Sequence, residues 1–198
     1  MMGGIKGQKH NPFIKGRYAH MNPNDVVFTP DWLAEKICSM YDIDGAVLEP
    51  CKGEGVFLKY LPIQTEWCEI VDGKNYYDYN KKIDWIVTNP PYSDFDRFLK
   101  HSFDLADNIV LLVPVAKMFK SMGTLKQIFD YGGFVEIHTL PARKAGFPFG
   151  FPCMICYIRK GYGGDTKIQM LDMVDKHYSV TDKGKRELEK RDIKGEIG

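Results

Sequence analysis

The sequence lacks several features that would place it in a functional class at once. Its 198 residues carry 27 Lys and Arg against 26 Asp and Glu, a net charge of +1, so no overall basic field indicates a polyanionic partner. No apolar run approaches the length of a membrane span, and no secretory leader is visible. From these absences we expect a cytoplasmic protein with no membrane partner.

Metal-ligand patterns are also scarce. The five cysteines are an odd number, and most of them lie in apolar runs, which is typical of reduced core residues. Cys153 and Cys156 have the spacing of a metal-binding pair, but no second pair and no nearby histidine accompanies them. The five histidines show no ligand spacing. We therefore expect no metal site.

The chain has the size and composition of one α/β domain. A length of 198 residues suits a single sizeable core, and 44% hydrophobic with 13% aromatic residues suit that class. Residues 1–24 contain four basic residues, four glycines and no acid, which predicts a flexible basic arm. A disordered terminus and a nucleic-acid contact are equal alternatives for this arm. We expect the domain over residues 25–180 and a charged tail over 181–198.

Apolar runs alternate with segments of helical periodicity along the expected domain. Helices are predicted over residues 31–40, 56–61, 95–106 and 118–129, and strands over 46–50, 65–69, 84–88, 109–113, 134–137 and 153–158, with another strand near 75–79. Thr29 is predicted to cap the first helix, with Pro30 at its first position. Strands that alternate with helices predict a doubly wound, mostly parallel sheet with a late antiparallel hairpin.

The most informative segment is Asn89-Pro90-Pro91-Tyr92, directly after the β-branched run 84–88. Two prolines cannot continue a central strand, and the residue before a proline is held extended. Asn89 is therefore expected at the carboxyl end of a buried strand, where α/β proteins bind their ligands. An amide there, beside a proline carbonyl and an aromatic ring, suits recognition of a planar NH2 group. A turn without chemistry is the alternative.

A glycine turn and a second strand-end acid precede this segment. The strand 46–50 ends at Glu49 and Pro50 and is followed by Gly53 and Gly55, which allow a ligand to approach the backbone closely. Glu69 ends the next strand, twenty residues after Glu49. An acid at that position commonly binds the ribose hydroxyls of an adenosine cofactor. An exposed carboxylate at a strand end is the alternative.

The tetrapeptide 89–92 resembles the signature of the S-adenosylmethionine-dependent amino-methyltransferases. These include adenine-N6 DNA methyltransferases, some RNA methyltransferases and protein glutamine methyltransferases. Residues 48–55 resemble the cofactor loop of that family, with Glu49 in place of the commoner aspartate, and residues 28–30 resemble the segment that covers the methionine end of the cofactor. The order of motifs is similar to the gamma arrangement of the DNA enzymes, although only a short tail stands where those usually carry a target-recognition domain.

The resemblance covers roughly residues 25–160 and implies a class I methyltransferase fold with a seven-stranded sheet. It implies transfer of a methyl group from S-adenosylmethionine to N6 of adenine in DNA, as in restriction-modification. The Asn89 side-chain oxygen and the Pro90 carbonyl would accept hydrogen bonds from the amine, while Pro91 shapes the turn and Tyr92 stacks on the base. The alternative functions are methylation of adenine in RNA, methylation of protein glutamine, and binding without catalysis by a module that kept the fold.

The resemblance also implies a set of cofactor residues, namely Phe28, Thr29, Glu49, Pro50, Cys51, Gly53, Gly55, Glu69, Asn75 and Tyr76. Asn75 and Tyr76 stand where the DNA enzymes often have an Asp-Phe pair, and residues 78–79 are an alternative. Phe147 and Phe149 lie where related enzymes often supply a second aromatic for the flipped base, or else they pack on their own hairpin. DNA is the expected partner, with RNA as a second choice. Recognition is expected through the arm, the loop 144–151, a second copy of the chain or a separate subunit.

Overall fold

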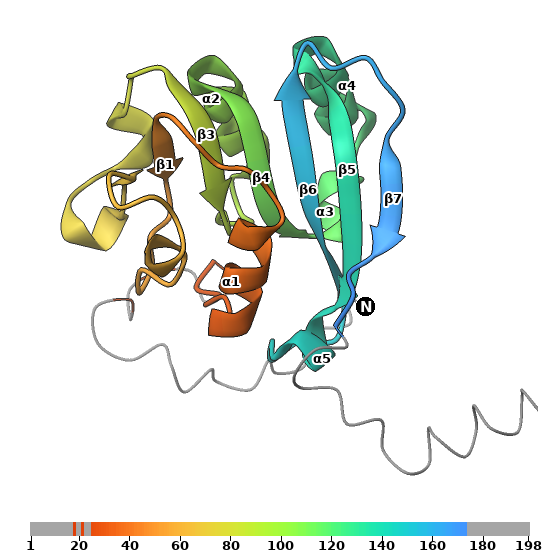
Figure 1. The fold of residues 1–198 in the computed structure, drawn as a ribbon, viewed down its shortest axis with the longest axis horizontal. Helices are drawn as coiled ribbons and strands as arrows, with labels where there is room; N and C mark the ends of the chain where they lie inside the picture. The colour runs from red at the N-terminus through yellow and green to blue at the C-terminus, as the bar shows by residue number, and fades with distance from the viewer. Residues whose placement is uncertain (1–17, 19–20, 22–24, 174–198) are drawn as a thin grey trace, which may run out of the picture.

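The computed structural model describes residues 25–173 together with Tyr18 and Met21. The strands within these residues form one seven-stranded sheet in the order β2-β1-β3-β4-β6-β5-β7 (Figure 1). The strands are Val47–Glu49 (β1), Glu66–Trp67 (β2), Ile83–Thr88 (β3), Ala106–Pro114 (β4), Gly132–Pro141 (β5), Pro152–Lys160 (β6) and Lys167–Met170 (β7). The expected tail 181–198 and most of the expected arm 1–24 lie outside the described residues.

The directions of the strands match the predicted mixed sheet. β1 is parallel to both β2 and β3, and β3 is parallel to β4. β6 is antiparallel to its neighbours β4 and β5, so β5 and β6 form the predicted late hairpin. The carboxyl ends of β1, β2 and β3 therefore meet at one edge of the sheet, which is where the Asn89 turn and the glycine turn follow.

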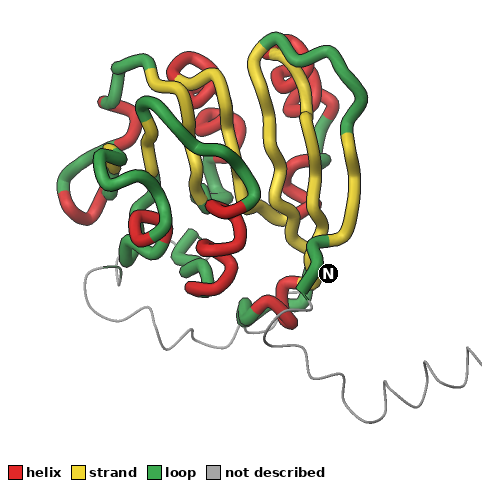
Figure 2. Tube along the Cα trace, in the orientation of Figure 1, coloured by secondary structure: helices red, strands yellow, loops and turns green. Residues whose placement is uncertain are grey.

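Helices cover both faces of the sheet (Figure 2). They are Asp31–Ser39 (α1), Phe95–Leu105 (α2), Val115–Met118 (α3), Met122–Tyr131 (α4) and Ala142–Ala145 (α5), with 3-10 turns at Phe57–Lys59 (η1), Ile70–Asp72 (η2) and Tyr76–Asp78 (η3). α1 and α5 contribute to the apolar cluster on one face, whereas α2, α3 and α4 contribute to the cluster on the other.

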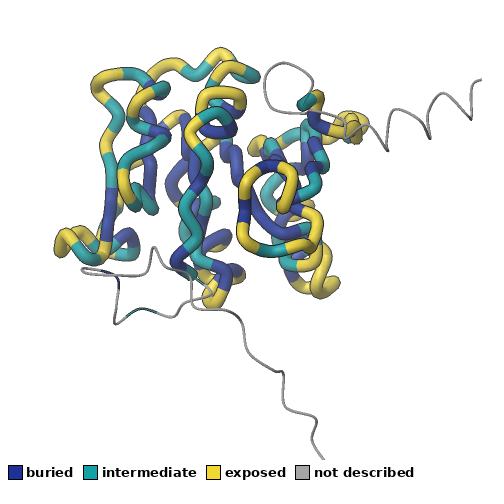
Figure 3. The backbone as a smooth tube through the Cα atoms, turned by 90° about the horizontal axis from the view of Figure 1, so that it is seen from below, coloured by how far each residue is buried: buried dark blue, intermediate teal, exposed yellow. Residues whose placement is uncertain are grey.

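Alternation along the strands supplies both clusters. In β3, Ile86 faces the α2 side while Trp85 and Val87 face the α1 side. α2 turns its buried residues inward at helical spacing, with Phe95, Phe98 and Leu99 on one face. Figure 3 shows buried positions in the interior, with exposed positions in the loops and on the outer turns of the helices. The central strands β3 and β4 are thus buried on both faces, as strands of parallel sheets are.

Three local predictions are wrong. The expected strand near 75–79 is the 3-10 turn η3, because the Asn75 side chain accepts a hydrogen bond from the Tyr77 amide and closes a turn. The expected helix 56–61 is reduced to η1, which ends three residues before Pro62. Thr29 does not cap α1, whose N-cap is Pro30 and whose first residue is Asp31.

The sequence interpretation also missed β7. This strand pairs with β5 at the far edge of the sheet, and all four of its residues are exposed. Because none of its residues is buried, no pattern of burial marks it in the sequence. Between residues 25 and 173, no helix combines the length and apolar character that a membrane crossing requires.

Candidate active site

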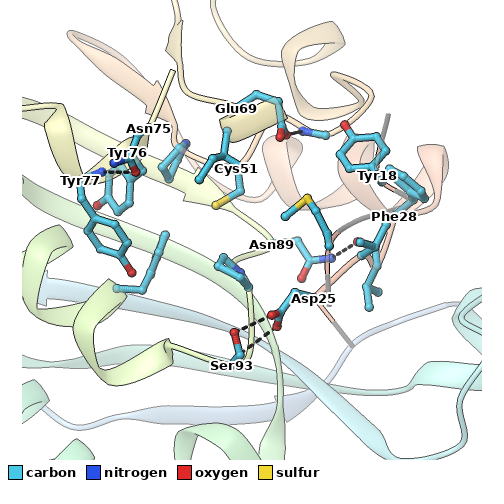
Figure 4. Close-up of a pocket in the computed structure, with 18 residues that line it drawn as sticks. Tyr18, Asp25, Phe28, Cys51, Glu69, Asn75, Tyr76, Tyr77, Asn89 and Ser93 are labelled. Carbon is cyan, nitrogen blue, oxygen red and sulfur yellow. Dashed lines mark hydrogen bonds between the residues drawn. The ribbon is translucent and has the colours of Figure 1, made fainter. Parts of the chain in front are cut away.

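A cavity of about 260 Å³ lies beyond the carboxyl ends of β1, β2 and β3 (Figure 4). Seven of the ten predicted cofactor residues line it: Phe28, Pro50, Cys51, Gly53, Glu69, Asn75 and Tyr76. Asn89 and Pro91 of the tetrapeptide line it as well. Segments that are distant in the sequence are therefore brought to one hollow at this edge of the sheet. Thr29, Glu49, Gly55, Pro90 and Tyr92 do not line it.

The glycine turn forms one wall of this cavity. Gly53 has a φ of +55°, and a Cβ placed there would lie 3.7 Å from the ring of Phe28. A side chain at this position would be strained and would also enter the space between the turn and Phe28. Gly55 has a φ of +80°, so its glycine is required by the turn, although it does not face the cavity.

Glu69 joins the ends of β1 and β2. Its side chain is buried, with Oε2 accepting a hydrogen bond from the Gly53 amide at 2.8 Å and Oε1 accepting one from the Val71 amide at 3.2 Å. The carboxylate lies at the cavity wall and retains acceptor capacity beyond these two bonds. It can therefore hold hydroxyl groups of a ligand while fixing the glycine turn.

Glu49 lies beneath the cavity, with no exposed surface. Its Oε1 accepts hydrogen bonds from the Cys51 amide, at 3.0 Å, and from the Thr88 hydroxyl. Its Oε2 has no hydrogen-bond partner among the described residues. Burial raises the pKa of Glu49 to about 8, so the carboxyl group is largely protonated at neutral pH. Glu49 thus links the glycine turn to the end of β3.

An aromatic wall closes the far side of the cavity. Tyr76 is buried against Phe98, with ring centroids 4.9 Å apart, and its hydroxyl shares a 2.8 Å hydrogen bond with Ser102. Asn75 precedes it, and its side-chain oxygen already accepts from the Tyr77 amide at 3.2 Å. A flat apolar group of a ligand can pack against this wall. Residues 78–79, the alternative in the sequence, do not line the cavity.

Asn89 is held by its amide nitrogen. Nδ2 donates to the Val27 carbonyl at 3.0 Å and to the Thr29 hydroxyl at 3.2 Å. The side-chain oxygen of Asn89 accepts a 3.0 Å hydrogen bond from the Tyr92 hydroxyl. Burial raises the pKa of Tyr92, so this phenol stays protonated and remains a donor. The Tyr92 ring itself is only 7% exposed, and its predicted stacking role stays a prediction.

Several cavity residues were missed by the sequence interpretation. Asp25 accepts hydrogen bonds from the amides of Tyr92 and Ser93, both at 2.8 Å, and from the Ser93 hydroxyl at 2.5 Å (Figure 4). One signal could have found it, since Asp25 is the first acid after 24 residues that contain none. Tyr18 and Met21 also line the cavity, although the sequence groups them with the basic arm.

The phenylalanines of the loop 147–151 form a ladder. Phe147 and Phe149 stack with centroids 5.2 Å apart, and Phe149 and Phe151 stack at 4.1 Å. Phe147 is buried in the cluster on the α1 face, whereas Phe151 is 42% exposed. Phe149 also packs against that cluster. Their contact with a base stays a prediction.

No protein-family profile matches the sequence, and no curated protein matches it. Solved structures do resemble it. A candidate class I S-adenosylmethionine-dependent methyltransferase from Listeria monocytogenes superposes with a TM-score of 0.58 at 14% identity, over 82% of this chain and 71% of that one. A candidate RNA methyltransferase from Pyrococcus horikoshii superposes with a TM-score of 0.53 at 17% identity, over 71% of this chain and 91% of that one.

The methyltransferase subunit of a type I restriction-modification system from Streptococcus thermophilus is a third neighbour. Its TM-score is 0.58 at 13% identity, over 82% of this chain and 52% of that one. The chain thus spans about half the length of this subunit. At 13–17% identity these likenesses establish the fold. The chain has the class I methyltransferase fold, and the predicted fold class is confirmed.

Proposed function

We propose that this chain transfers a methyl group from S-adenosylmethionine to the N6 amine of adenine in DNA. The observation that carries the proposal is the orientation of Asn89 at the edge of the cavity. Its Nδ2 is held by Val27 and Thr29, so its Oδ1 faces away from them as a hydrogen-bond acceptor. An acceptor oxygen beside a nucleoside-sized cavity suits an amine substrate.

The cavity fits the proposed cofactor. Gly53 leaves space that a side chain would fill, Glu69 offers a carboxylate for the ribose hydroxyls, and the wall of Tyr76 and Phe98 suits the adenine. When bound, the cofactor supplies a methyl group on a sulfonium. Phe28 and Cys51 line the cavity between Gly53 and Asn89, and burial raises the pKa of the Cys51 thiol well above its usual range. This neutral thiol suits a wall rather than a nucleophile.

The acceptor amine would bind at Asn89. The Asn89 Oδ1 and the Pro90 carbonyl would accept its two hydrogens, which fixes the direction of the nitrogen lone pair. Both oxygens would also stabilise the charge that develops on the nitrogen. Pro91 keeps the turn from continuing as a strand, and Tyr92 would hold the base out of the stack.

DNA is the proposed substrate. The rival proposals are methylation of adenine in RNA, methylation of protein glutamine, and an inactive binding module. The motif order in the sequence and the restriction-modification neighbours support DNA. The neighbour described as a candidate RNA methyltransferase favours the first rival. We propose residues 25–180 as the catalytic domain, and a second copy of the chain or a separate subunit as candidates for recognition.

The test is a transfer assay with labelled cofactor. Wild type and Asn89→Ala are each incubated with unmethylated DNA, RNA and a protein extract, and the labelled product is identified by mass spectrometry. We expect label in DNA as N6-methyladenine. Asn89→Ala should abolish transfer, while cofactor affinity by calorimetry stays within about threefold, since its oxygen faces the amine.

The other outcomes would either favour a rival function or exclude Asn89 from the mechanism. Label in RNA or in protein glutamine would replace the DNA proposal by that rival. Cofactor binding without label in any acceptor would favour the inactive module. Full transfer by a folded Asn89→Ala protein would remove Asn89 from the mechanism.

A further inference from the structure

Residues 25–29, which we call the strap, run between the cavity and the Asn89 turn. The strap belongs to no helix or strand, so side-chain and backbone contacts determine its position. Asp25, Val27 and Phe28 line the cavity, while Asp25, Val27 and Thr29 contact residues 89–93. One short segment therefore touches both the proposed cofactor space and the proposed acceptor turn (Figure 4).

Asp25 fixes the second half of the turn. Its Oδ1 accepts from two consecutive backbone amides, those of Tyr92 and Ser93, and its Oδ2 accepts from the Ser93 hydroxyl. Bonds to a carboxylate are stronger than bonds between neutral groups. Because both amides belong to the backbone, Asp25 restrains the direction of the chain after Pro91 rather than one rotamer. The position of the Tyr92 ring depends on that direction.

Thr29 and the Val27 carbonyl fix the first half of the turn. A backbone carbonyl is an acceptor only, so the Asn89 group that faces Val27 must be its NH2. The Thr29 hydroxyl receives the other hydrogen of the same NH2. With both hydrogens engaged, Oδ1 is directed to the opposite side, where it meets the Tyr92 hydroxyl. A reversed amide would place the Asn89 oxygen against the Val27 carbonyl oxygen, two acceptors with no hydrogen between them.

We infer that Asp25 and Thr29 are positioning residues for the acceptor amine, and that they act through Asn89 and Tyr92. The inference rests on the proposed function. Neither residue needs to touch the amine, since Thr29 sets the direction of the Asn89 oxygen and Asp25 sets the turn that carries Tyr92. Thr29 was expected to bind the cofactor, but it lies outside the cavity lining, so its loss is expected to affect the rate rather than cofactor binding.

The test compares pairs of variants in the full chain. Thr29→Val keeps the shape of the side chain but removes the acceptor, and Thr29→Ser keeps the hydroxyl. Asp25→Ala removes all three hydrogen bonds, and Asp25→Asn keeps one acceptor oxygen. Asp44→Ala is the matched control, since Asp44 is exposed and lies outside the cavity lining. Circular dichroism and thermal melting establish that each variant is folded.

The first measurement on each variant is kinetic and is accompanied by cofactor affinity. We expect Thr29→Val to lower kcat for transfer by about tenfold, the effect of one hydrogen bond, and Asp25→Ala by about a hundredfold. Thr29→Ser should restore the rate, and Asp25→Asn should fall between wild type and Asp25→Ala. Cofactor affinity of the Thr29 variants should stay within about threefold of wild type. Asp44→Ala should match wild type.

The second measurement does not depend on activity. The side-chain NH2 signal of Asn89 is assigned in an NMR spectrum by its loss in Asn89→Ala. Its exchange with water should be faster in Thr29→Val by about tenfold, because one of its two acceptors is missing, and close to wild type in Thr29→Ser.

The outcomes separate the two proposals. If wild type labels no acceptor, the proposed function fails, while the exchange of the Asn89 NH2 still tests the strap. If wild type is active but Asp25→Ala and Thr29→Val have its kcat, the positioning role is wrong. Equal rates for Thr29→Val and Thr29→Ser overturn the part of the inference that concerns the hydroxyl.

Discussion

The cofactor end and the acceptor end of the proposed site differ in what occupies them. At the cofactor end, Gly53, Glu69 and Tyr76 border a cavity of about 260 Å³. At the acceptor end, the Asn89 oxygen already holds the Tyr92 hydroxyl, and the Tyr92 ring is only 7% exposed. A cofactor can therefore enter a preformed space, whereas an acceptor amine must replace a group of the protein at the Asn89 oxygen or share that oxygen with it through the second lone pair.

The difference follows from how each end is built. The cofactor end consists of turns between strands, fixed by Glu69 and by the backbone. The acceptor end consists of polar side chains that satisfy one another, because buried polar groups need partners. If the amine replaces the Tyr92 hydroxyl, Asn89 keeps its number of hydrogen bonds but the phenol loses this partner. An amine that uses the second lone pair of the Asn89 oxygen adds a hydrogen bond instead.

Glu49 connects the two ends, and we expect the largest effect there. The pKa is 4.5 for an unperturbed glutamate and about 8 for buried Glu49, so between these values the folded protein holds a proton that the unfolded chain has released. The free energy of unfolding is then highest below pH 4.5 and falls as pH rises to about 8, with a slope approaching one proton. In Glu49→Gln this contribution is absent, and the neutral side chain can keep the bonds to Cys51 and Thr88.

Urea unfolding at a series of pH values measures this slope in both proteins. The difference in unfolding free energy between Glu49→Gln and wild type should grow in favour of the variant as pH rises from 5 to 8, within the range given by the raised pKa. A constant difference across that range would mean that Glu49 is already ionised in the folded protein.

Glu69→Ala tests whether the cofactor end is a binding site, with the next largest effect. The variant should bind S-adenosylmethionine about ten- to a hundredfold more weakly, the scale of one or two charge-assisted hydrogen bonds. Part of the loss would come from the Gly53 amide, which Glu69 also holds. Glu69→Gln is the matched control, because it can still accept from that amide. Calorimetry that gives equal affinity for Glu69→Ala and wild type would rule out a ribose role.

The two ends also differ in how far the sequence predicted them. The sequence predicted that Gly53, Glu69 and Asn89 lie at one cavity, because each follows a strand whose apolar run is distinct. Parallel strands place their carboxyl ends together, so residues after each strand must meet. What the sequence could not show is that Glu49 points away from the cavity, since its direction depends on Thr88, a residue of a neighbouring strand.

The acceptor end was predicted in its motif but not in its contacts. Asp25 and Thr29 precede Asn89 by about sixty residues, and no local pattern indicates which side chains a loop will contact. From the sequence, Thr29 was predicted to be a helix cap because threonine favours that position. In the structure its hydroxyl accepts from Asn89 instead, so a tertiary contact prevailed over a local propensity.

The smallest effect is expected for Tyr92→Phe, which separates the hydroxyl of Tyr92 from its ring. The variant keeps the ring and frees the Asn89 oxygen, so we expect kcat for transfer within a few fold of wild type. Tyr92→Ala also removes the ring. The loss of base stacking should raise the free-energy barrier to transfer by about 1–3 kcal/mol. Because Tyr92 is buried, Tyr92→Ala will also be less stable, and rates are therefore compared at a temperature where melting curves show every variant folded.

Equal rates for Tyr92→Phe and Tyr92→Ala would show that stacking is not the contribution of Tyr92. A large loss already in Tyr92→Phe would show that the hydroxyl serves the reaction, and the hydrogen bond from Tyr92 to Asn89 would then belong to the active arrangement.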